Sequence, residues 1–127
     1  MFENLEILRT AQAMATHATQ RQNLIAHNVA NANTPDFRAK DLTDFAETYR
    51  QASGEGMRAT RAGHIGAGDA VLRAGSIEDT AEPAPNGNNV SLENELVKSV
   101  DVKREHDLAL TIYRTSLGIL RSSIGKG

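Results

Sequence analysis

Residues 28–37 read Asn-Val-Ala-Asn-Ala-Asn-Thr-Pro-Asp-Phe, and this stretch decides where the first long helix of the chain stops. Pro35 has no backbone N–H and disfavours helical geometry at Thr34, so a helix that arrives from the N-terminus ends here. Asn31 and Asn33 tolerate left-handed backbone geometry and bond back to the chain, which releases it sideways. Three asparagines within six residues exceed the needs of one helix end, and we expect some of them to bond to another chain.

The segment before this stop predicts one long helix, from about Phe2 to Asn33. It contains neither Gly nor Pro. Its apolar or small residues are three or four apart, a spacing that places them in one stripe along a helix. The stripe consists of Leu5, Leu8, Ala11, Ala15, Ala18, Ile25, Val29 and Ala32, with Gln22 in the same row. Because alanines are frequent in it, we expect neighbouring helices to approach closely.

A second long helix is predicted from Ser91 to about Ile124. Its apolar residues alternate steps of four and three, which is the register of a coiled coil, with a polar stretch in the middle. This seam reads Leu92, Leu96, Ser99, Lys103, His106, Leu110, Tyr113, Leu117, Leu120 and Ile124. A second row widens the apolar arc, at Val97, Val100, Ile112 and Ile119. A helix that is apolar on more than one side usually has more than one neighbour.

Both ends of this second helix carry recognisable signals. Ser91 is a good N-cap, and Glu93 and Glu95 place negative charge at the positive end of the helix dipole. At the other end Gly125 is a natural residue for the position just after a helix.

The middle of the chain, residues 35–90, has a different composition. It holds all three prolines and seven of the ten glycines. Residues 41–50 predict a short amphipathic helix, because Leu42, Phe45, Ala46 and Tyr49 have helical spacing. From 51 to 87 no period is visible, and we expect a long loop with a small strand at 70–73. The sequence thus predicts a mainly α fold in three parts: residues 1–34, the middle segment 35–90, and residues 91–127. The two long terminal helices pair as an antiparallel, coiled-coil-like hairpin.

Composition excludes several classes of protein. Of 127 residues, 39% are hydrophobic and 4% aromatic, so the chain has little to bury alone and we expect a partner surface to complete its core. A net charge of −2 without a dense basic cluster argues against nucleic-acid binding. No apolar run approaches the length of a membrane span, and residues 1–6 do not look like the start of a cleaved signal peptide.

No residue pattern nominates a reaction, a cofactor or a metal. The chain has no cysteine and none of the common nucleophile or phosphate-binding motifs. The four histidines (His17, His27, His64 and His106) form no pair at helical spacing, so we interpret them as surface or interface residues rather than metal ligands. We therefore predict a protein that is not an enzyme.

Residues 28–38 resemble the signature of the bacterial flagellar axial proteins, which form the rod and the hook. The matching residues of the motif are Asn28, Asn31, Ala32, Asn33, Thr34, Pro35 and Phe37. Four features are similar to proximal-rod members of that family: the short length, Arg21-Gln22, Arg38-Ala39-Lys40-Asp41, and Asn86-Gly87-Asn88-Asn89-Val90 before the last helix. Two positions depart from the pattern. Asp36 stands where the family has Gly, so we expect a slightly altered left-handed turn, and Ser91 replaces the usual Asp.

The resemblance implies a structural subunit of the proximal rod of the flagellar basal body, with no cofactor. Its implied partners are copies of itself, other rod subunits, the rod-to-membrane-ring adaptor, the membrane ring, and the flagellar type III export apparatus. It implies a periplasmic rod position, reached without a cleaved signal, and neither nucleic-acid binding nor membrane insertion. The residues expected to carry helix packing and assembly are Leu5, Leu8, Ala15, Ile25, Val29, Leu92, Leu96, Leu110, Tyr113, Leu117, Leu120 and Ile124, with Ser91 as helix cap.

Two alternatives stay open from the sequence. One is the neighbouring proximal-rod subunit of the same family, and the other is a helical adaptor or export chaperone that dimerises through its last helix.

Overall fold

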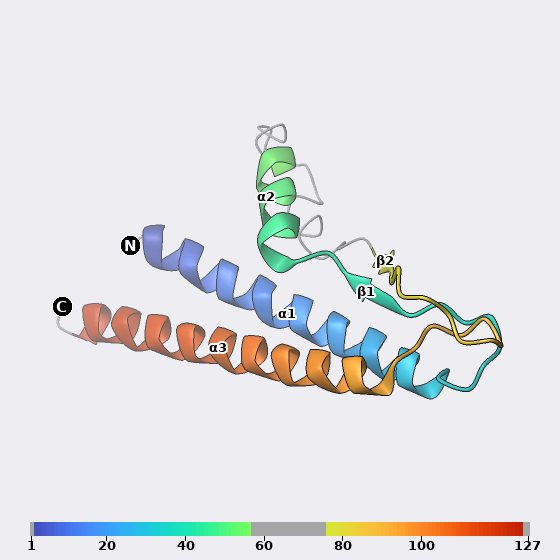
Figure 1. Cartoon of the computed structure of the whole chain (residues 1–127). Coiled ribbons are helices and arrows are strands. Elements are labelled where there is room, and N and C mark those ends of the chain that lie inside the picture. Colours follow the sequence, from blue (N-terminus) through green and yellow to red (C-terminus); the bar gives the residue numbers. More distant parts are fainter. Residues whose placement is uncertain (1, 57–75, 126–127) are drawn as a thin grey trace.

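The structure is a computed structural model that describes residues 2–56 and 76–125. Three helices and two short strands follow in the order α1 (Phe2–Ala30), β1 (Lys40–Leu42), α2 (Phe45–Gly56), β2 (Ser76–Glu78) and α3 (Leu92–Gly125). Figure 1 shows α1 and α3 as a long hairpin, from which α2 projects.

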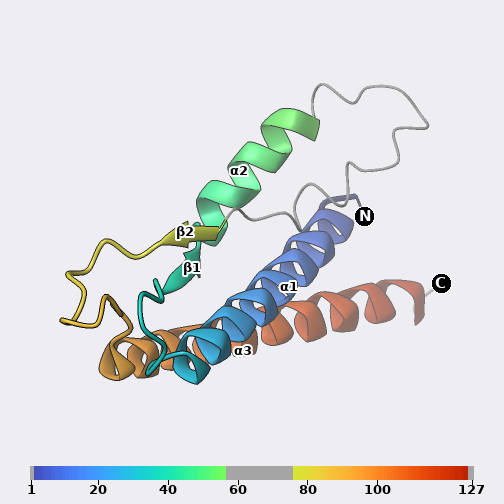
Figure 2. The same cartoon turned by 90° about the vertical axis from the view of Figure 1, so that its right-hand side faces the viewer.

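α1 and α3 lie side by side and run in opposite directions, so the two ends of the chain are at the same end of the hairpin (Figure 1 and Figure 2). Their contacts outnumber those between any other two elements. The buried side chains between them recur every seven residues, as in a coiled coil. They are Ala11, Ala18 and Ile25 on α1, and Glu95, Val102, Ala109 and Ser116 on α3. The predicted mainly α fold with paired, antiparallel terminal helices is therefore confirmed.

The leucine-rich seam predicted on the last helix is not the seam that meets α1. The predicted seam steps four residues from Leu92 to Leu96. In the structure the residue that is buried against α1 is Glu95, three residues after Leu92. Leu96 is 68% exposed. Other exposed members of the predicted seam are Leu92, Tyr113, Leu117 and Ile124. The reason is steric: the facing row of α1 is rich in alanine, and helices that approach closely accommodate Ala109 and Ser116 better than leucine.

α1 ends at Ala30, three residues before the predicted end. The Asn31 N–H donates to the carbonyls of His27 and Asn28, with an N···O distance of 3.1 Å to each. The Asn31 side-chain NH₂ donates to the His27 carbonyl at 2.8 Å. Neither Asn31 nor Asn33 takes the left-handed conformation that we expected of them. Among the described non-glycine residues only Asp36 has a positive φ, of 60°. The turn therefore comes after Pro35, at the position where the flagellar signature has Gly.

Asp36 is held against the chain that leads into α3. Its N–H donates to the Asn86 carbonyl over 3.0 Å. The neighbouring Gly87 is also left-handed, with φ of 85°, and a Cβ placed on it would meet the Asp36 carboxylate and lie 3.1 Å from the Asp36 Cα. Gly87 is thus required both by its backbone conformation and by the close approach of Asp36.

The short helix predicted at 41–50 begins later and extends further than expected, since α2 covers Phe45–Gly56. Its first turn is closed by Thr48, whose N–H donates to the Asp44 carbonyl over 3.0 Å. Residues Lys40–Leu42 form β1, which pairs antiparallel with β2 so that Asp41 lies opposite Ile77. Leu42, expected on the apolar face of the helix, is buried as a strand residue. The tertiary hydrogen bonds of Lys40, described below, favour the extended backbone over local helical spacing.

The strand predicted at 70–73 lies outside the described residues. The loop predicted from 51 to 87 is correct only in part, because it includes the end of α2 and the unpredicted strand β2.

Replacing two of the glycines by alanine should change the free energy of unfolding in opposite directions. We expect Gly87→Ala to lower the free energy of unfolding by about 1–3 kcal/mol, because an L side chain is strained at this φ and its Cβ would press on Asp36. Gly118 lies inside α3, and a methyl group added there would meet nothing within 4 Å beyond the backbone of its own helix. Gly118→Ala should therefore raise the same free energy by up to about 1 kcal/mol. Urea denaturation followed by circular dichroism measures both, and changes of the same sign would contradict the geometry.

Candidate assembly surface

Asn28 joins the end of α1 to β1. It is fully buried, with 1% of its surface exposed. Its side-chain NH₂ donates to the Lys40 carbonyl over 2.7 Å, and its Oδ1 accepts from the Lys40 N–H over 3.0 Å. The amide thus satisfies both backbone groups of one strand residue, as a neighbouring strand would.

Two further buried asparagines hold the segment before α3. The Asn88 side chain donates to the carbonyls of Asn31 and Thr34, over 2.9 and 2.8 Å. The Asn89 Oδ1 accepts from the Ala39 N–H over 2.6 Å, and its NH₂ donates to the Asp79 carbonyl over 2.9 Å. We call Asn28, Asn88 and Asn89 the asparagine latch. Asn28 and Asn31 thus bond within their own chain. That some asparagines of residues 28–33 also bond to another chain stays a prediction.

A cluster of charged groups lies beside the latch. The Arg21 guanidinium makes a two-point contact with Asp41, at 2.9 and 3.2 Å, and lies 3.7 Å from Glu105. Lys98 lies 3.3 Å from Glu95, 3.7 Å from Asp79 and 4.0 Å from Asp41. α1, the strands and α3 are therefore joined by charge as well as by hydrogen bonds.

Arg21 keeps its charge in this setting. Burial by itself lowers its pKa, but the hydrogen bond and the charge of Asp41, with Glu105 and Asp101 further away, outweigh burial and raise the pKa above its ordinary value. The carboxylates outnumber the cations of the cluster. Among residues 2–56 and 76–125, nothing hydrogen-bonds the buried Oε2 atoms of Glu95 and Glu105.

β1 and the start of α2 cover one side of α1. The Thr10 and Tyr49 hydroxyls are 3.1 Å apart. The His17 Nε2 donates to the Thr43 carbonyl over 2.8 Å, and its ring meets the edge of Phe45 at 5.5 Å. His17 is therefore a buried structural residue on this covered side.

The opposite side of the hairpin is open and largely apolar. On α1, Leu8, Ala15 and Val29 share a row of seven-residue spacing with Gln22, and Leu5 shares another with Thr19. On α3, one row contains Lys103 and another contains Ser99 and His106. The apolar members of the α3 rows are Leu92, Leu96, Leu110, Tyr113, Leu117, Leu120 and Ile124. These rows border one groove, so the expected packing residues, all except the buried Ile25, lie together on what we call the open face.

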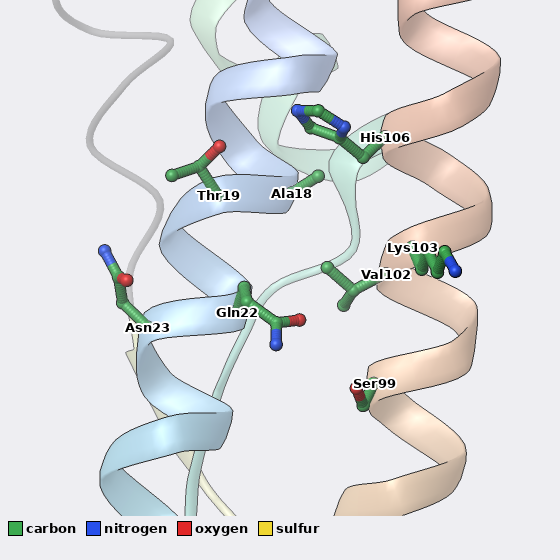
Figure 3. A pocket seen from close by; sticks show the side chains of 8 residues that line it. All are labelled: Ala18, Thr19, Gln22, Asn23, Ser99, Val102, Lys103 and His106. Carbon is green, nitrogen blue, oxygen red and sulfur yellow. The ribbon is translucent and has the colours of Figure 1, made fainter.

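The middle of the open face is the interhelix groove, of about 340 Å³ (Figure 3). Ala18, Thr19, Gln22 and Asn23 line it from α1, and Ser99, Val102, Lys103 and His106 line it from α3. The polar stretch that interrupts the predicted seam is therefore one wall of this groove. Apolar side chains at Leu96 and Leu110 lie one heptad apart on either side of Lys103.

The described residues offer no arrangement for metal chemistry. In residues 2–56 and 76–125 no group of three or more His, Cys, Asp or Glu side chains could hold a metal ion. Within the same ranges, no helix is both long and apolar enough to pass through a lipid bilayer. What this geometry offers is surface for other protein chains.

Sequence reasoning finds the residues of the open face but not the latch. From the sequence, Asn88 and Asn89 are singled out only by the family resemblance, and the same is true of Arg21 and Asp41. The available signal was compositional: three asparagines and a glycine in residues 86–89, directly before a helix cap. Ser91 lies where it was expected, and its Oγ accepts from the Asn94 N–H over 3.4 Å.

Comparison with known proteins decides the family. A flagellar basal body rod protein FlgB of Agrobacterium fabrum is 31% identical over 117 residues, which cover 87% of each chain. FlgB of Cereibacter sphaeroides is 36% identical over 116 residues, covering 90% of this chain and 84% of its own. The chain belongs to the FlgB family. FlgB of Salmonella typhimurium is 29% identical over 122 residues, covering 87% of this chain and 86% of its own. No protein-family model matches the chain.

Membership in the FlgB family confirms the resemblance to flagellar axial proteins. It favours the rod subunit over the adaptor or export chaperone, because these relatives are named as rod proteins. The segments whose resemblance indicated the proximal rod are bonded to one another and to the signature residue Asn28. Arg21 bonds to Asp41, Asn89 to Ala39, and Asn28 to Lys40. In this FlgB-family chain these segments therefore meet in one folded junction.

The latch makes a prediction for stability. Asn28→Ala removes a buried group that satisfies both the N–H and the carbonyl of Lys40, so we expect the free energy of unfolding to fall by about 2–4 kcal/mol. Asn33→Ala is the matched control, because Asn33 is exposed and its change should stay within about 0.5 kcal/mol. Urea denaturation of both variants measures the difference. If Asn28→Ala lowers the free energy of unfolding no more than Asn33→Ala does, the Asn28 amide of the latch contributes nothing to stability.

Proposed function

We propose that this chain is a structural subunit of the proximal rod of the bacterial flagellar basal body and has no enzymatic activity. It packs with copies of itself and with other rod subunits at the base of the drive shaft. Its further partners are the rod-to-membrane-ring adaptor and the membrane ring. The flagellar type III apparatus exports it to the periplasm without cleavage of a signal.

The observation that carries the proposal is the contrast between the two sides of the hairpin. The covered side is tied by the latch, the Arg21–Asp41 pair and His17 to the chain's own middle segment. The open face leaves large apolar side chains uncovered by the described residues, with Leu96 and Ile124 about 70% exposed. Contiguous exposed apolar surface of this kind marks a protein interface. It spans the length of both helices, as packing within a filament requires.

Individual expected residues keep their proposed roles on this face. Leu5, Leu8, Ala15 and Val29 supply the α1 border, and the leucines of α3 supply the other. The signature residues contribute indirectly, through the turn after α1 that Asn88 holds in place. This turn contains Asn31, Ala32, Thr34 and Pro35.

Leu117→Asp tests the role of the open face. Leu117 is exposed, so the isolated chain should fold as before, whereas a buried carboxylate in the rod would be strongly unfavourable. In a strain that lacks the gene for this chain, the variant should be exported but should fail to enter basal bodies, and swimming should be lost.

Ser122→Asp is the matched control, because Ser122 is exposed on the other side of the same helix and receives the same charge. It should support swimming. If cells with Leu117→Asp swim fully and the variant is present in their isolated basal bodies, the open face has no role in assembly.

A further inference from the structure

A second exposed apolar area lies on the rear of α3. It comprises Val97, Val100 and Leu108, which are 61%, 53% and 51% exposed, and we call it the rear patch. Val97 and Val100 follow the buried Glu95 by two and five residues, about 200° and 140° around a helix, so they face away from α1. Leu108 immediately precedes the buried Ala109 and lies on the flank of α3. The corresponding side of α1 is polar, with Arg9, Thr16 and His27. The two helices therefore differ on their outer sides.

Charge distinguishes the rear patch from the interhelix groove. Around the patch, Glu93, Asp101 and Asp107 are exposed carboxylates, and the bases nearest to it are Arg104 and, one turn after Val100, Lys103. The groove carries Lys103 and His106 and no carboxylate among its lining residues. Both surfaces have apolar side chains beyond the charges: Val97 and Leu108 on the patch, Leu96 and Leu110 beside the groove. The patch therefore has more carboxylates than bases around it, whereas the groove lining has no carboxylate.

We propose that the rear patch of one copy docks into the interhelix groove of the next copy. This proposal rests on the proposed rod function and names the contact by which identical subunits meet. The carboxylates near Val100 lie against Lys103 and His106, and the apolar groups on either side bury one another. Because the two surfaces lie on different sides of one chain, each copy offers both, and the contact repeats without pairing off.

A second copy is favoured over a symmetric dimer by electrostatics. Docking groove against groove would bring Lys103 of one copy toward Lys103 of the other, and patch against patch would bring carboxylates together. The heterologous arrangement brings the carboxylates around the patch of one copy to the carboxylate-free groove of the next. The polar groove walls within an otherwise apolar face also fix the register, as a polar residue does in a coiled-coil seam.

Engineered cysteines test the contact directly, because the chain contains no cysteine of its own. Gln22→Cys places a thiol in the groove, and Val100→Cys places one in the rear patch. Within one chain Gln22 points toward α3, whereas Val100 points away from α1, so the two thiols face different directions. Cells that lack the native gene and swim on the double variant are treated with a mild oxidant, and their basal bodies are run on a non-reducing gel.

The double variant should give a ladder of dimers, trimers and larger species, because every copy is linked on both sides. Each single variant, the matched control, should stay monomeric. Dimers from Val100→Cys alone would indicate a symmetric contact and overturn the proposal. Swimming cells whose double variant stays monomeric would also overturn it, while leaving the rod function intact. Absence of the unmodified chain from the basal bodies of swimming cells would count against the rod function itself.

A charge variant keeps the proposal falsifiable if the cysteines disturb assembly. Lys103→Glu should reduce the incorporation of this chain into basal bodies several-fold, because the groove then repels the rear patch. Arg9→Glu makes the same change on the polar side of α1 and should have no effect. Equal incorporation of the two variants would contradict the charge pairing.

Discussion

The buried amide of Asn28 is the interaction on which the rest of this structure depends. It bonds both backbone groups of Lys40 and so holds β1 in place next to the last turns of α1. With β1 fixed, Asp41 reaches Arg21, Thr43 reaches His17, and α2 starts beside α1. Asn88 and Asn89 repeat the device from the other side, so three asparagines replace a hydrophobic core at the closed end of the hairpin. Such an arrangement suits a chain with few large apolar side chains to bury.

The hairpin itself is held by small side chains, and this choice determines what remains outside. Ala11, Ala18, Val102, Ala109 and Ser116 let α1 and α3 approach closely. The leucines of α3 are then too large for the contact and lie beside it. A monomer built in this way is closed by polar bonds at one end and has its largest apolar groups on its surface. The same feature leaves large apolar side chains exposed, which supports the proposed role of the open face in assembly.

The long elements and their pairing could be predicted because they depend on local rules. Absence of Gly and Pro, helical spacing, the Ser91 cap and the Thr34-Pro35 stop each act within a few residues. The seam of α3 was displaced because periodicity reveals an apolar face without saying which neighbour covers it. Leu96 is as well spaced as Glu95, and only the alanines opposite decide between them. β1 was expected to be helical because the bond from Asn28 spans twelve residues and leaves no trace in the local pattern. The bonds of Asn88 and Asn89 to residues 31–39 could not be predicted for the same reason, since their partners are 50 or more residues apart.

That separation has a consequence for how the chain acquires its shape. A polypeptide that emerges N-terminus first presents Asn31, Thr34 and Ala39 long before the side chains that will hold them. Bringing these ends together costs loop-closure entropy, and no bond compensates until Asn88 and Asn89 are present. α1 can make its contacts to residues 40–49 early, but it lacks its α3 neighbour until the last third of the sequence is present. The hairpin is therefore completed late.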